Sequence, residues 1–311
     1  METLPKNRQI MNDSLRLSIR HRVAKIEQTP AIAGVFLPLL KLLNSDADAS
    51  LDDVVRLVSY DNTIAAQCLR VAGSPLFGLA QAPNSIKGAV VSLGLRRVET
   101  ILLTCCLGKM FPVKKWVLDP EVFWRHSLGC AMMCRKFSEK LPRSDHDKAY
   151  TAGLLHDIGF MANCVVYPTE FSGAMKIACQ DGAPLHEAEL TSMGFTHCDT
   201  GRALAEKWHL ANDIMEVITH HHGVENSSQA PALVALVYLC DSLCRMRGLG
   251  YGYYECHKFN MVADPAWAIL ANEYRELEGI DLVRFTYEMD DAFVEIQSMV
   301  DMVFGKKTVS A

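Results

Sequence analysis

The chain has 311 residues, half of them hydrophobic and 22% charged, which is typical of a soluble globular protein with one large or two moderate domains. Its formal net charge of -5 argues against recruitment by nucleic acid or by an anionic membrane. No apolar run approaches the roughly 18 residues of a membrane span, and residues 1–28 are too charged for a signal peptide. We therefore expect a cytoplasmic protein whose eleven cysteines are reduced.

Apolar residues recur at helical spacing almost throughout, and no segment shows the two-residue alternation of a strand. In the first part of the chain, the helices are expected over about 8–27, 31–43, 50–59, 62–72, 85–93 and 97–110. In the second part, they are expected over about 120–141, 146–165, 167–180, 184–192, 197–208, 211–222, 230–247, 264–277 and 281–303. The pattern predicts an all-α protein.

Two proline dipeptides, Phe111-Pro112 and Asp119-Pro120, bracket a linker at which we place a domain boundary. We expect an N-terminal helical part over 1–115, a helical core over 116–250 and a C-terminal extension over 251–311. A glycine-rich stretch, 248–252, follows the last helix of the core. No strand precedes this stretch and no Lys-Ser/Thr follows it, which favours a helix stop over a phosphate-binding loop.

One histidine of the first core helix faces inward. Phe123, His126, Cys130 and Met133 fall on a single apolar stripe of the 120–141 helix. Taken alone, a histidine in such a place is more often held by hydrogen bonds than by a metal ion. His126 is therefore a candidate ligand only if further ligands converge on it.

The stretch around His156 and Asp157 is apolar on most sides, yet it carries two strong metal-ligand side chains. An isolated buried carboxylate is unstable unless something neutralises it, and no lysine or arginine lies one turn away on the same helix. Adjacent residues on a helix point about 100° apart. The pair could therefore reach two metal ions, with Asp157 as the bridge. The alternative is an aspartate held by backbone amides or by a distant arginine.

Later helices add further inward-facing histidines. His197 lies in the first turn of a helix that opens with a capping box. In the 211–222 helix, His221 and His222 share the apolar side, whereas His220 lies off it beside Glu216. Two of these three consecutive histidines therefore face the core.

A second acid, Asp241, shares a face with apolar residues and is expected to lack a neighbouring base. One or two divalent cations would satisfy the whole set of inward ligands together. This set comprises His126, His156, Asp157, His197, His221, His222 and Asp241. Mixed imidazole and carboxylate ligands suit iron, manganese or zinc better than magnesium or calcium.

The order of His126, then His156-Asp157, then Asp241 on separate helices resembles the H…HD…D signature of the HD phosphohydrolase superfamily. The added histidines look like the extra ligands of its HD-GYP branch, the cyclic-di-GMP phosphodiesterases. The closest resemblance is to the HDOD family, over roughly 20–280. It is carried by Asn62-Thr-Ile-Ala-Ala-Gln-Cys-Leu-Arg-Val-Ala-Gly-Ser-Pro-Leu-Phe-Gly, by Ser85-Ile-Lys-Gly-Ala-Val-Val-Ser-Leu-Gly-Leu, and by Glu189-x4-Gly194-Phe195-x-His197.

This resemblance implies a multi-helical, HD-domain-like bundle with an additional N-terminal helical subdomain. Such modules occur mainly in bacterial signalling and regulatory proteins, so a protein partner of that kind is implied. The chain departs from the HD-GYP pattern in two places. Phe160 replaces the lysine expected after His156-Asp157-Ile158-Gly159, and no GYP motif follows His222. Hydrolysis of cyclic-di-GMP is therefore not favoured.

Two functional hypotheses follow. The first, which we favour, is a regulatory module whose metal cluster orders the core. Its surface or its N-terminal half, near 20–115, would contact signalling partners, and the exposed faces of that half could equally be plain solvated helix. The second is a metal-dependent phosphohydrolase acting on a nucleotide or another phosphoester, with Asp157 as the catalytic bridge.

In the second hypothesis, metal ions would lower the pKa of a bound water and so create the nucleophile. One ion would be held by His126, His156, Asp157 and Asp241, and the other by Asp157, His197, His221 and His222. The substrate phosphate would need a cation. Candidates are Arg125, Arg202 and Lys207, each of which could equally be a plain surface charge.

Overall fold

The structure is a computed structural model that describes residues 13–26, 32–39, 50–59, 62–73, 78–107, 117–256 and 259–304. Every regular element within these ranges is a helix, which confirms the all-α prediction. Parts of the helices expected over 8–27, 31–43 and 97–110 lie outside the described residues, as does the Phe111-Pro112 dipeptide.

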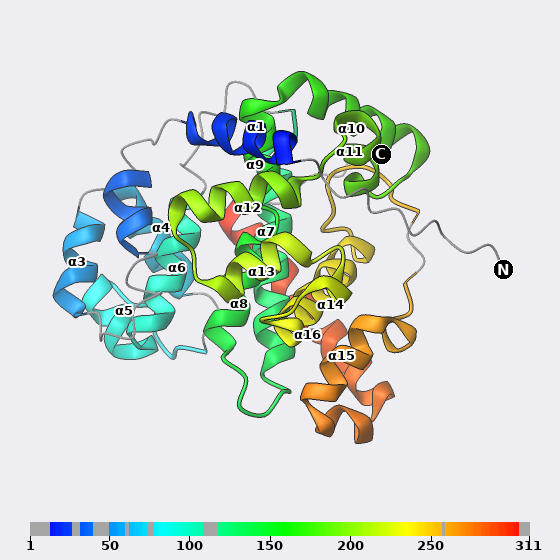
Figure 1. Cartoon of the computed structure of the whole chain (residues 1–311). Coiled ribbons are helices and arrows are strands. Elements are labelled where there is room, and N and C mark those ends of the chain that lie inside the picture. Colours follow the sequence, from blue (N-terminus) through cyan, green and yellow to red (C-terminus); the bar gives the residue numbers. More distant parts are fainter. Residues whose placement is uncertain are drawn as a thin grey trace.

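The N-terminal part contains α1 (Asp13–Ala24), the π-helical turn η1 (Ile32–Phe36), α3 (Leu51–Ser59), α4 (Asn62–Ala72), α5 (Ile86–Leu93) and α6 (Leu95–Leu107). Helices α3 to α6 lie together at the left of Figure 1. Capping side chains begin two of them: the Ser50 hydroxyl accepts from the Asp53 amide at 3.1 Å, and the Ser85 hydroxyl accepts from the Gly88 amide at 3.0 Å. Both helix starts agree with the expectation from the sequence.

The core contains α7 (Pro120–Ser138), α8 (His146–Leu155), α9 (Ile158–Val166), α10 (Pro168–Asp181), α11 (Leu185–Met193), α12 (His197–Trp208), α13 (Asn212–His220), η4 (Val224–Asn226) and α14 (Pro231–Met246). Helix α7 runs through the middle of the molecule and is buried along almost its whole length (Figure 1). Of these helices, α8 and α14 pack directly against α7, and α12 packs against α9 and α13.

The C-terminal part contains η5 (Met261–Ala263), α15 (Pro265–Glu273), η6 (Arg275–Gly279) and α16 (Leu282–Phe304). Helix α16 packs against α7 and α4, and helix α15 packs against α14. The rings of Phe285 and Phe137, for example, lie 4.9 Å apart between α16 and α7. This C-terminal part therefore covers α7 from outside.

Two glycines let the core helices approach closely. A Cβ on Gly153 of α8 would lie 2.9 Å from the Ala131 Cα of α7. A Cβ on Gly159 of α9 would overlap the His197 carbonyl oxygen of α12 and lie 2.8 Å from the Gly201 amide nitrogen. Only glycine fits at either position, because the neighbouring atoms are backbone. The α8–α9 junction is consequently pressed against both α7 and α12.

The single helix expected over 146–165 is wrong. The structure breaks it at His156 and Asp157, which end α8 and begin α9. Asp157 has φ -100° and ψ 15°, a conformation outside the helical region, and its side chain makes no capping hydrogen bond. The break turns the Asp157 carboxylate into the core. The positive end of the α9 dipole also lies beside this carboxylate.

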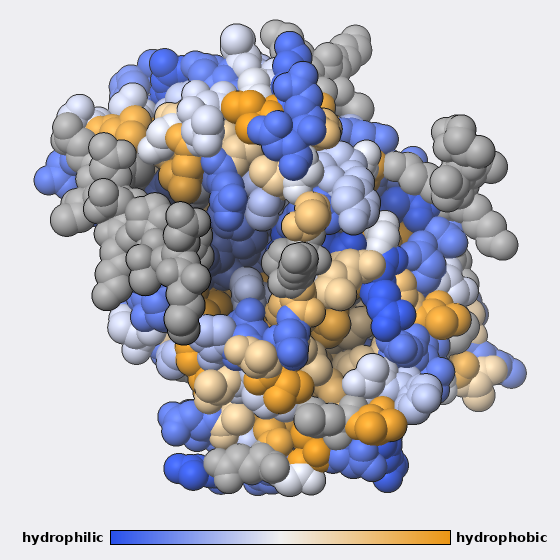
Figure 2. Space-filling view, turned by 90° about the vertical axis from the view of Figure 1, so that its right-hand side faces the viewer, coloured by the Kyte–Doolittle hydropathy of each residue, from blue (hydrophilic) through white to orange (hydrophobic). Residues whose placement is uncertain are grey.

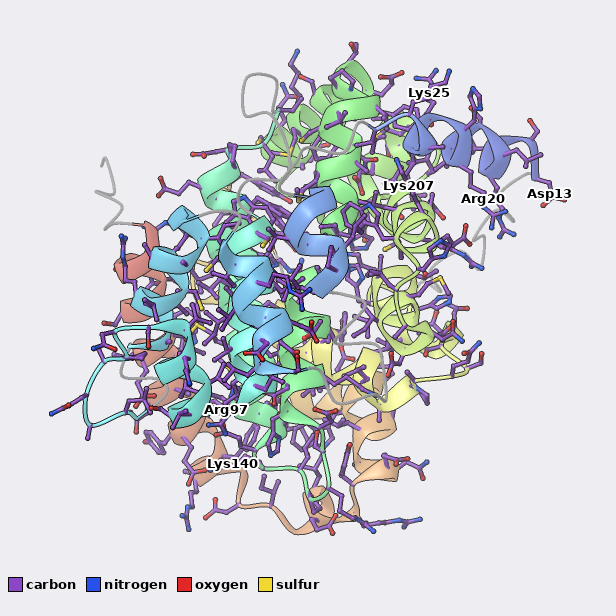
Figure 3. The ribbon with its side chains drawn as sticks, turned by 90° about the vertical axis from the view of Figure 1, so that its left-hand side faces the viewer. Asp13, Arg20, Lys25, Arg97, Lys140 and Lys207 are labelled. Atoms are coloured by element: carbon purple, nitrogen blue, oxygen red, sulfur yellow. The ribbon has the colours of Figure 1, made fainter. Side chains whose placement is uncertain are left out.

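Helix α1 lies across α12 and is tied to it by charged side chains (Figure 3). Arg20 pairs with Glu206 at 2.8 Å. The Lys207 ammonium donates to the carbonyl oxygens of Val23, Ala24 and Ile26, which lie at and just beyond the C-terminal end of α1. Lys207 therefore acts as a C-terminal cap of α1.

On the face shown in Figure 2, hydrophobic and hydrophilic residues are interspersed. Among the described residues, none of the helices combines the length and the apolar character needed to span a bilayer.

Candidate metal centre

Asp157 lies at the meeting point of two groups of ligand side chains. Its Oδ2 atom is 3.0 Å from His156 Nε2 and 3.4 Å from His126 Nε2. Its Oδ1 atom is 3.1 Å from His197 Nε2 and 3.2 Å from His221 Nε2. One carboxylate oxygen thus faces each group, as a bridge between two ions requires.

The first group joins α7, the α8–α9 junction and α14. His126 Nε2 is 3.3 Å from both His156 Nε2 and Asp241 Oδ1, and the separation between His156 Nε2 and Asp241 Oδ1 is 4.0 Å. Bonds of about 2.0–2.2 Å to a metal ion place neighbouring ligand atoms roughly 3.0–3.5 Å apart. Most of these separations therefore match the edges of a coordination polyhedron.

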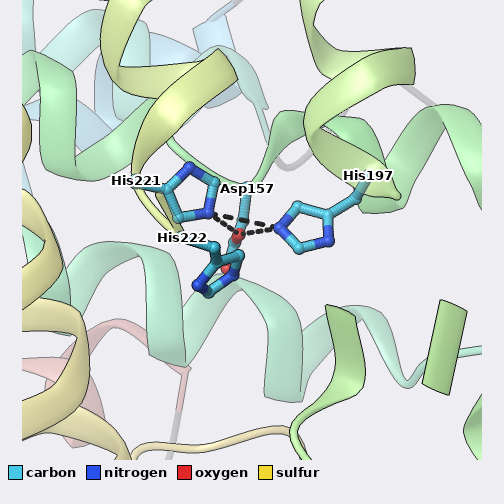
Figure 4. Close-up of side chains that lie close together, drawn as sticks. All are labelled: Asp157, His197, His221 and His222. Atoms are coloured by element: carbon cyan, nitrogen blue, oxygen red, sulfur yellow. Dashed lines mark hydrogen bonds and ion pairs between the residues drawn. The ribbon is translucent and has the colours of Figure 1, made fainter. Parts of the chain in front are cut away.

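The second group surrounds the other oxygen of Asp157, between the beginning of α12 and the end of α13 (Figure 4). His197 Nε2 and His221 Nε2 are 3.2 Å apart, and His222 completes the group. Helix α13 ends at His220, two residues earlier than expected. His221 caps that end and His222 follows in the turn, while His220 lies outside the group with its Nε2 3.9 Å from Glu216, as expected.

The orientation of four imidazoles shows what they are arranged to hold. In each ring Nδ1 faces an oxygen that can only accept a hydrogen bond, so a neutral ring carries its proton on Nδ1 and directs the lone pair of Nε2 inward. The four pairs are His126 with the Leu249 carbonyl at 2.6 Å, His156 with the Gly153 carbonyl at 2.7 Å, His221 with the Val217 carbonyl at 3.0 Å, and His197 with the Glu189 carboxylate at 2.6 Å. Inward lone pairs this close repel one another unless a cation or a proton lies between them.

Two carboxylate oxygens in the same space lack a donor. Asp157 Oδ1 and Asp241 Oδ2 are buried without a hydrogen-bond partner. A buried acceptor left without a partner costs about 1–3 kcal/mol, and more for a charged group. A bound cation removes this cost, so the donor set fits a divalent metal ion.

Protons compete with a metal ion for the imidazole nitrogens of both groups. Burial by itself lowers the pKa of His126, but hydrogen bonds with Asp157 and Asp241 raise it to about 9. Burial likewise opposes protonation of His221, whereas the Cys198 sulfur and the Asp157 carboxylate raise its pKa to about 10. In the metal-free protein, protonated imidazoles therefore neutralise the carboxylates, and a metal ion must displace these protons when it binds.

Glu189 of α11 supports the second group and is not among the residues assigned from the sequence. Its Oε2 accepts both the backbone amide and the Nδ1–H of His197, and its Oε1 accepts from Asn163 at 2.8 Å. A carboxylate behind a ligating histidine orients the ring and increases its basicity. The only signal for Glu189 in the sequence is its place in the motif that resembles the HDOD family.

The expectation that Asp241 lacks a neighbouring base is wrong. Arg245, one turn further along α14, donates from Nε to Asp241 Oδ1 at 3.0 Å. Arg245 in turn pairs with Glu255 at 2.5 Å. The four-residue spacing between Asp241 and Arg245 is visible in the sequence and indicates this pair. Asp241 is therefore only partly dependent on a metal ion for its charge balance.

The three cations considered for substrate phosphate have other partners. Arg125 pairs with Glu121 at 3.0 Å and with Asp301 at 2.7 Å, and Lys207 caps α1. Arg202 pairs with Glu206 at 3.2 Å. A phosphate role for these residues stays a prediction.

A cavity of about 730 Å³ lies between α1, α11, α12 and α13. Its wall includes His222 of the second ligand group, together with His186, Cys198 and Arg202. The His186 ring stacks on the His222 ring at 4.1 Å, and burial lowers the pKa of His186 to about 3, so that this ring is neutral. The second ligand group therefore has a route to the surface through this cavity.

The fold and the site together define an all-helical protein with a buried cluster of histidines and aspartates. The chain matches the HDOD domain over residues 29–224, more than half of its length. It therefore belongs to the HDOD family.

Two solved structures and one sequence are similar to this chain. An HDOD domain protein with unknown function from Geobacter sulfurreducens is similar with a TM-score of 0.80 and 28% identity, over 94% of this chain and 99% of that one. A protein from Marinobacter aquaeolei VT8, provisionally named a signal transduction protein, shares the fold with a TM-score of 0.71 and 19% identity, over 95% of this chain and 67% of that one. An uncharacterized protein of Treponema pallidum (strain Nichols) is 25% identical over 235 residues, 73% of this chain. The matched region spans 44% of that relative's length.

Proposed function

We propose that this chain is an HDOD regulatory module in which one or two buried divalent metal ions join the core helices into a single rigid body that contacts a signalling partner. The observation that most strongly supports a bound metal is that the Nε2 atoms of four histidines point inward around Asp157. The ligand chemistry favours iron, manganese or zinc. The ligands come from α7, the α8–α9 junction, α12, the end of α13 and α14, so metal and fold depend on each other.

A regulatory role is supported by what surrounds the cluster. Phe160, which occupies the position of the lysine expected in the HD-GYP pattern, packs its ring 3.8 Å from the His197 ring. An aromatic ring there cannot neutralise a phosphate group. Arg125 and Lys207, two of the candidate cations, are held by other groups. The similar Marinobacter protein carries a signal-transduction name.

A specific observation favours the second candidate function, a metal-dependent phosphohydrolase. His222 and the half-exposed Arg202 both line the surface cavity, so a phosphoester in that cavity would lie beside the second ligand group. In this role, bound metal would acidify a water molecule, and Asp157 would hold the two metal positions together.

Turnover distinguishes the two functions. The full chain, loaded with manganese or iron, is assayed against a generic phosphodiester beside Asp157→Asn. We expect no turnover above the Asp157→Asn background, and we expect that variant to lose metal because a neutral amide cannot bridge two cations. His220→Ala is the matched control and should retain the wild-type metal content, because His220 lies outside both groups. Turnover that Asp157→Asn abolishes would establish the enzyme instead.

A further inference from the structure

The glycine-rich stretch after α14 does more than end that helix. Gly248 and Gly252 both have φ of +85°, a conformation that favours glycine. The chain between them turns back toward α7, where the Leu249 carbonyl accepts the Nδ1–H of His126. The Leu249 side chain lies against Gly129 of α7, at the place where a Cβ would be. This loop therefore holds a ligand histidine in position.

The same loop brings a phenol into the first ligand group. Tyr251 is buried, with its ring 4.6 Å from the His126 ring and 5.1 Å from the Phe160 ring. Its hydroxyl donates to Asp157 Oδ2. That oxygen belongs to the first group, since it is 3.0 Å from His156 Nε2 and 3.4 Å from His126 Nε2. The phenol oxygen thus borders the space that the first ion would occupy.

We propose that Tyr251 is a phenolate ligand of the ion held by His126, His156, Asp157 and Asp241. This proposal rests on the proposed metal-holding function and extends it to a residue of the loop. On binding, the phenol O–H bond is replaced by an oxygen–metal bond, and the proton leaves to solvent, as protons do when other protein ligands take up a metal. The oxidation state of the ion does not change in this step.

Two consequences follow for the first position. The phenolate oxygen would join two carboxylates and two imidazoles. This set contains no thiolate and is rich in hard oxygen donors, which suits iron. The phenol also occupies space that a hydrolytic site leaves open for water. Ligand exchange is therefore confined to the second position, which reaches the surface cavity through His222.

Ferric iron gives this proposal an optical signature, because phenolate bound to iron(III) produces a charge-transfer band in the visible range. The full chain is freed of metal with a chelator, loaded with ferrous iron and oxidised in air. We expect wild type to develop a visible band whose resonance Raman spectrum contains phenolate ring modes. Tyr251→Phe should bind iron at the second position but show no such band.

Tyr253→Phe is the matched control from the same loop. The Tyr253 hydroxyl donates to the Ala183 carbonyl at 2.9 Å, and its removal should leave the band unchanged. If the resonance Raman spectrum of iron-loaded wild type lacks phenolate modes, the role of Tyr251 is overturned and the metal site is left intact. This outcome is measured on wild type alone, so it does not depend on the folding of a variant. A band that persists in Tyr251→Phe also overturns it. Wild type that binds no iron overturns the proposed iron site together with the tyrosine ligand.

Discussion

At the scale of the residue, the site depends on what lies behind each ligand. Asp157 has no cation of its own, and its two oxygens face four ring nitrogens. Asp241, by contrast, shares its charge with Arg245. The two acids therefore differ in their need for metal: loss of the metal leaves Asp157 dependent on protonated imidazoles, whereas Asp241 retains a permanent partner.

Replacing Glu189 by glutamine tests whether the carboxylate behind His197 strengthens metal binding by the second group. A glutamine oxygen in place of Oε2 can still accept both hydrogen bonds from His197, but the charge behind the ring is lost and the amide group would face the Asn163 donor. Changes of this kind reduce metal affinity by about 10–100-fold. We expect that loss for one ion and little change for the other, measured by metal titration of the chelated protein. An equal loss of both ions would contradict the division into two groups.

The pH dependence of the metal-free protein follows from the raised pKa values of two histidines. His126 and His221 have folded-state pKa values of about 9 and about 10, above the ordinary value of 6.5. Groups raised in this way contribute stability that is fully present below pH 6.5 and is lost as the pH rises through 9 to 10. We expect the melting temperature of the chelated protein to fall over this range.

The metal-loaded protein should behave differently over the same range. Protons compete with metal for the imidazole nitrogens, so metal affinity rises with pH. The difference in melting temperature between loaded and chelated protein should therefore widen from pH 6.5 upward. A constant difference would contradict the competition between protons and metal at these histidines.

At the scale of the element, the cluster exists because helices approach each other at glycine. Helix α9 touches the beginning of α12 through Gly159, which places Asp157 and His197 within reach of each other. The capping box of Thr196 and Asp199 fixes where α12 begins, and thereby where His197 lies. Backbone contacts therefore set the ligand spacing.

Gly159→Ala should separate these two elements. The added methyl group would overlap the His197 carbonyl oxygen, which is backbone and cannot rotate away. Overpacking of this kind costs about 1–3 kcal/mol or more, and we expect metal content to fall with stability. Thermal unfolding and metal analysis measure both effects. Gly279→Ala is the control, because nothing lies within 4 Å of a Cβ there. Wild-type metal content in Gly159→Ala would show that α9 and α12 can move apart without loss of the site.

At the scale of the whole molecule, ligands separated by more than a hundred residues in sequence meet around Asp157. A ligand that binds only the folded state stabilises it by an amount that grows with its concentration, about 4.1 kcal/mol at a thousand times Kd. A cluster that joins the core helices should behave in this way.

Removal of metal by a chelator should therefore lower the melting temperature of the entire chain, and added iron, manganese or zinc should restore it. Calorimetry measures the shift. A melting temperature that is indifferent to both treatments would contradict any structural role for metal in this protein.

The sequence alone determined the helical class, most of the helix ranges and which histidines and aspartates face the core, because helical periodicity is local and shows which residues face inward. It also contained the Asp241–Arg245 spacing that indicates an ion pair. Only the tertiary structure decided the break between α8 and α9, the carboxylate behind His197 and the return of Tyr251 to Asp157. These features depend on contacts between residues far apart in the chain, and periodicity within one helix carries no information about which distant side chain will meet it.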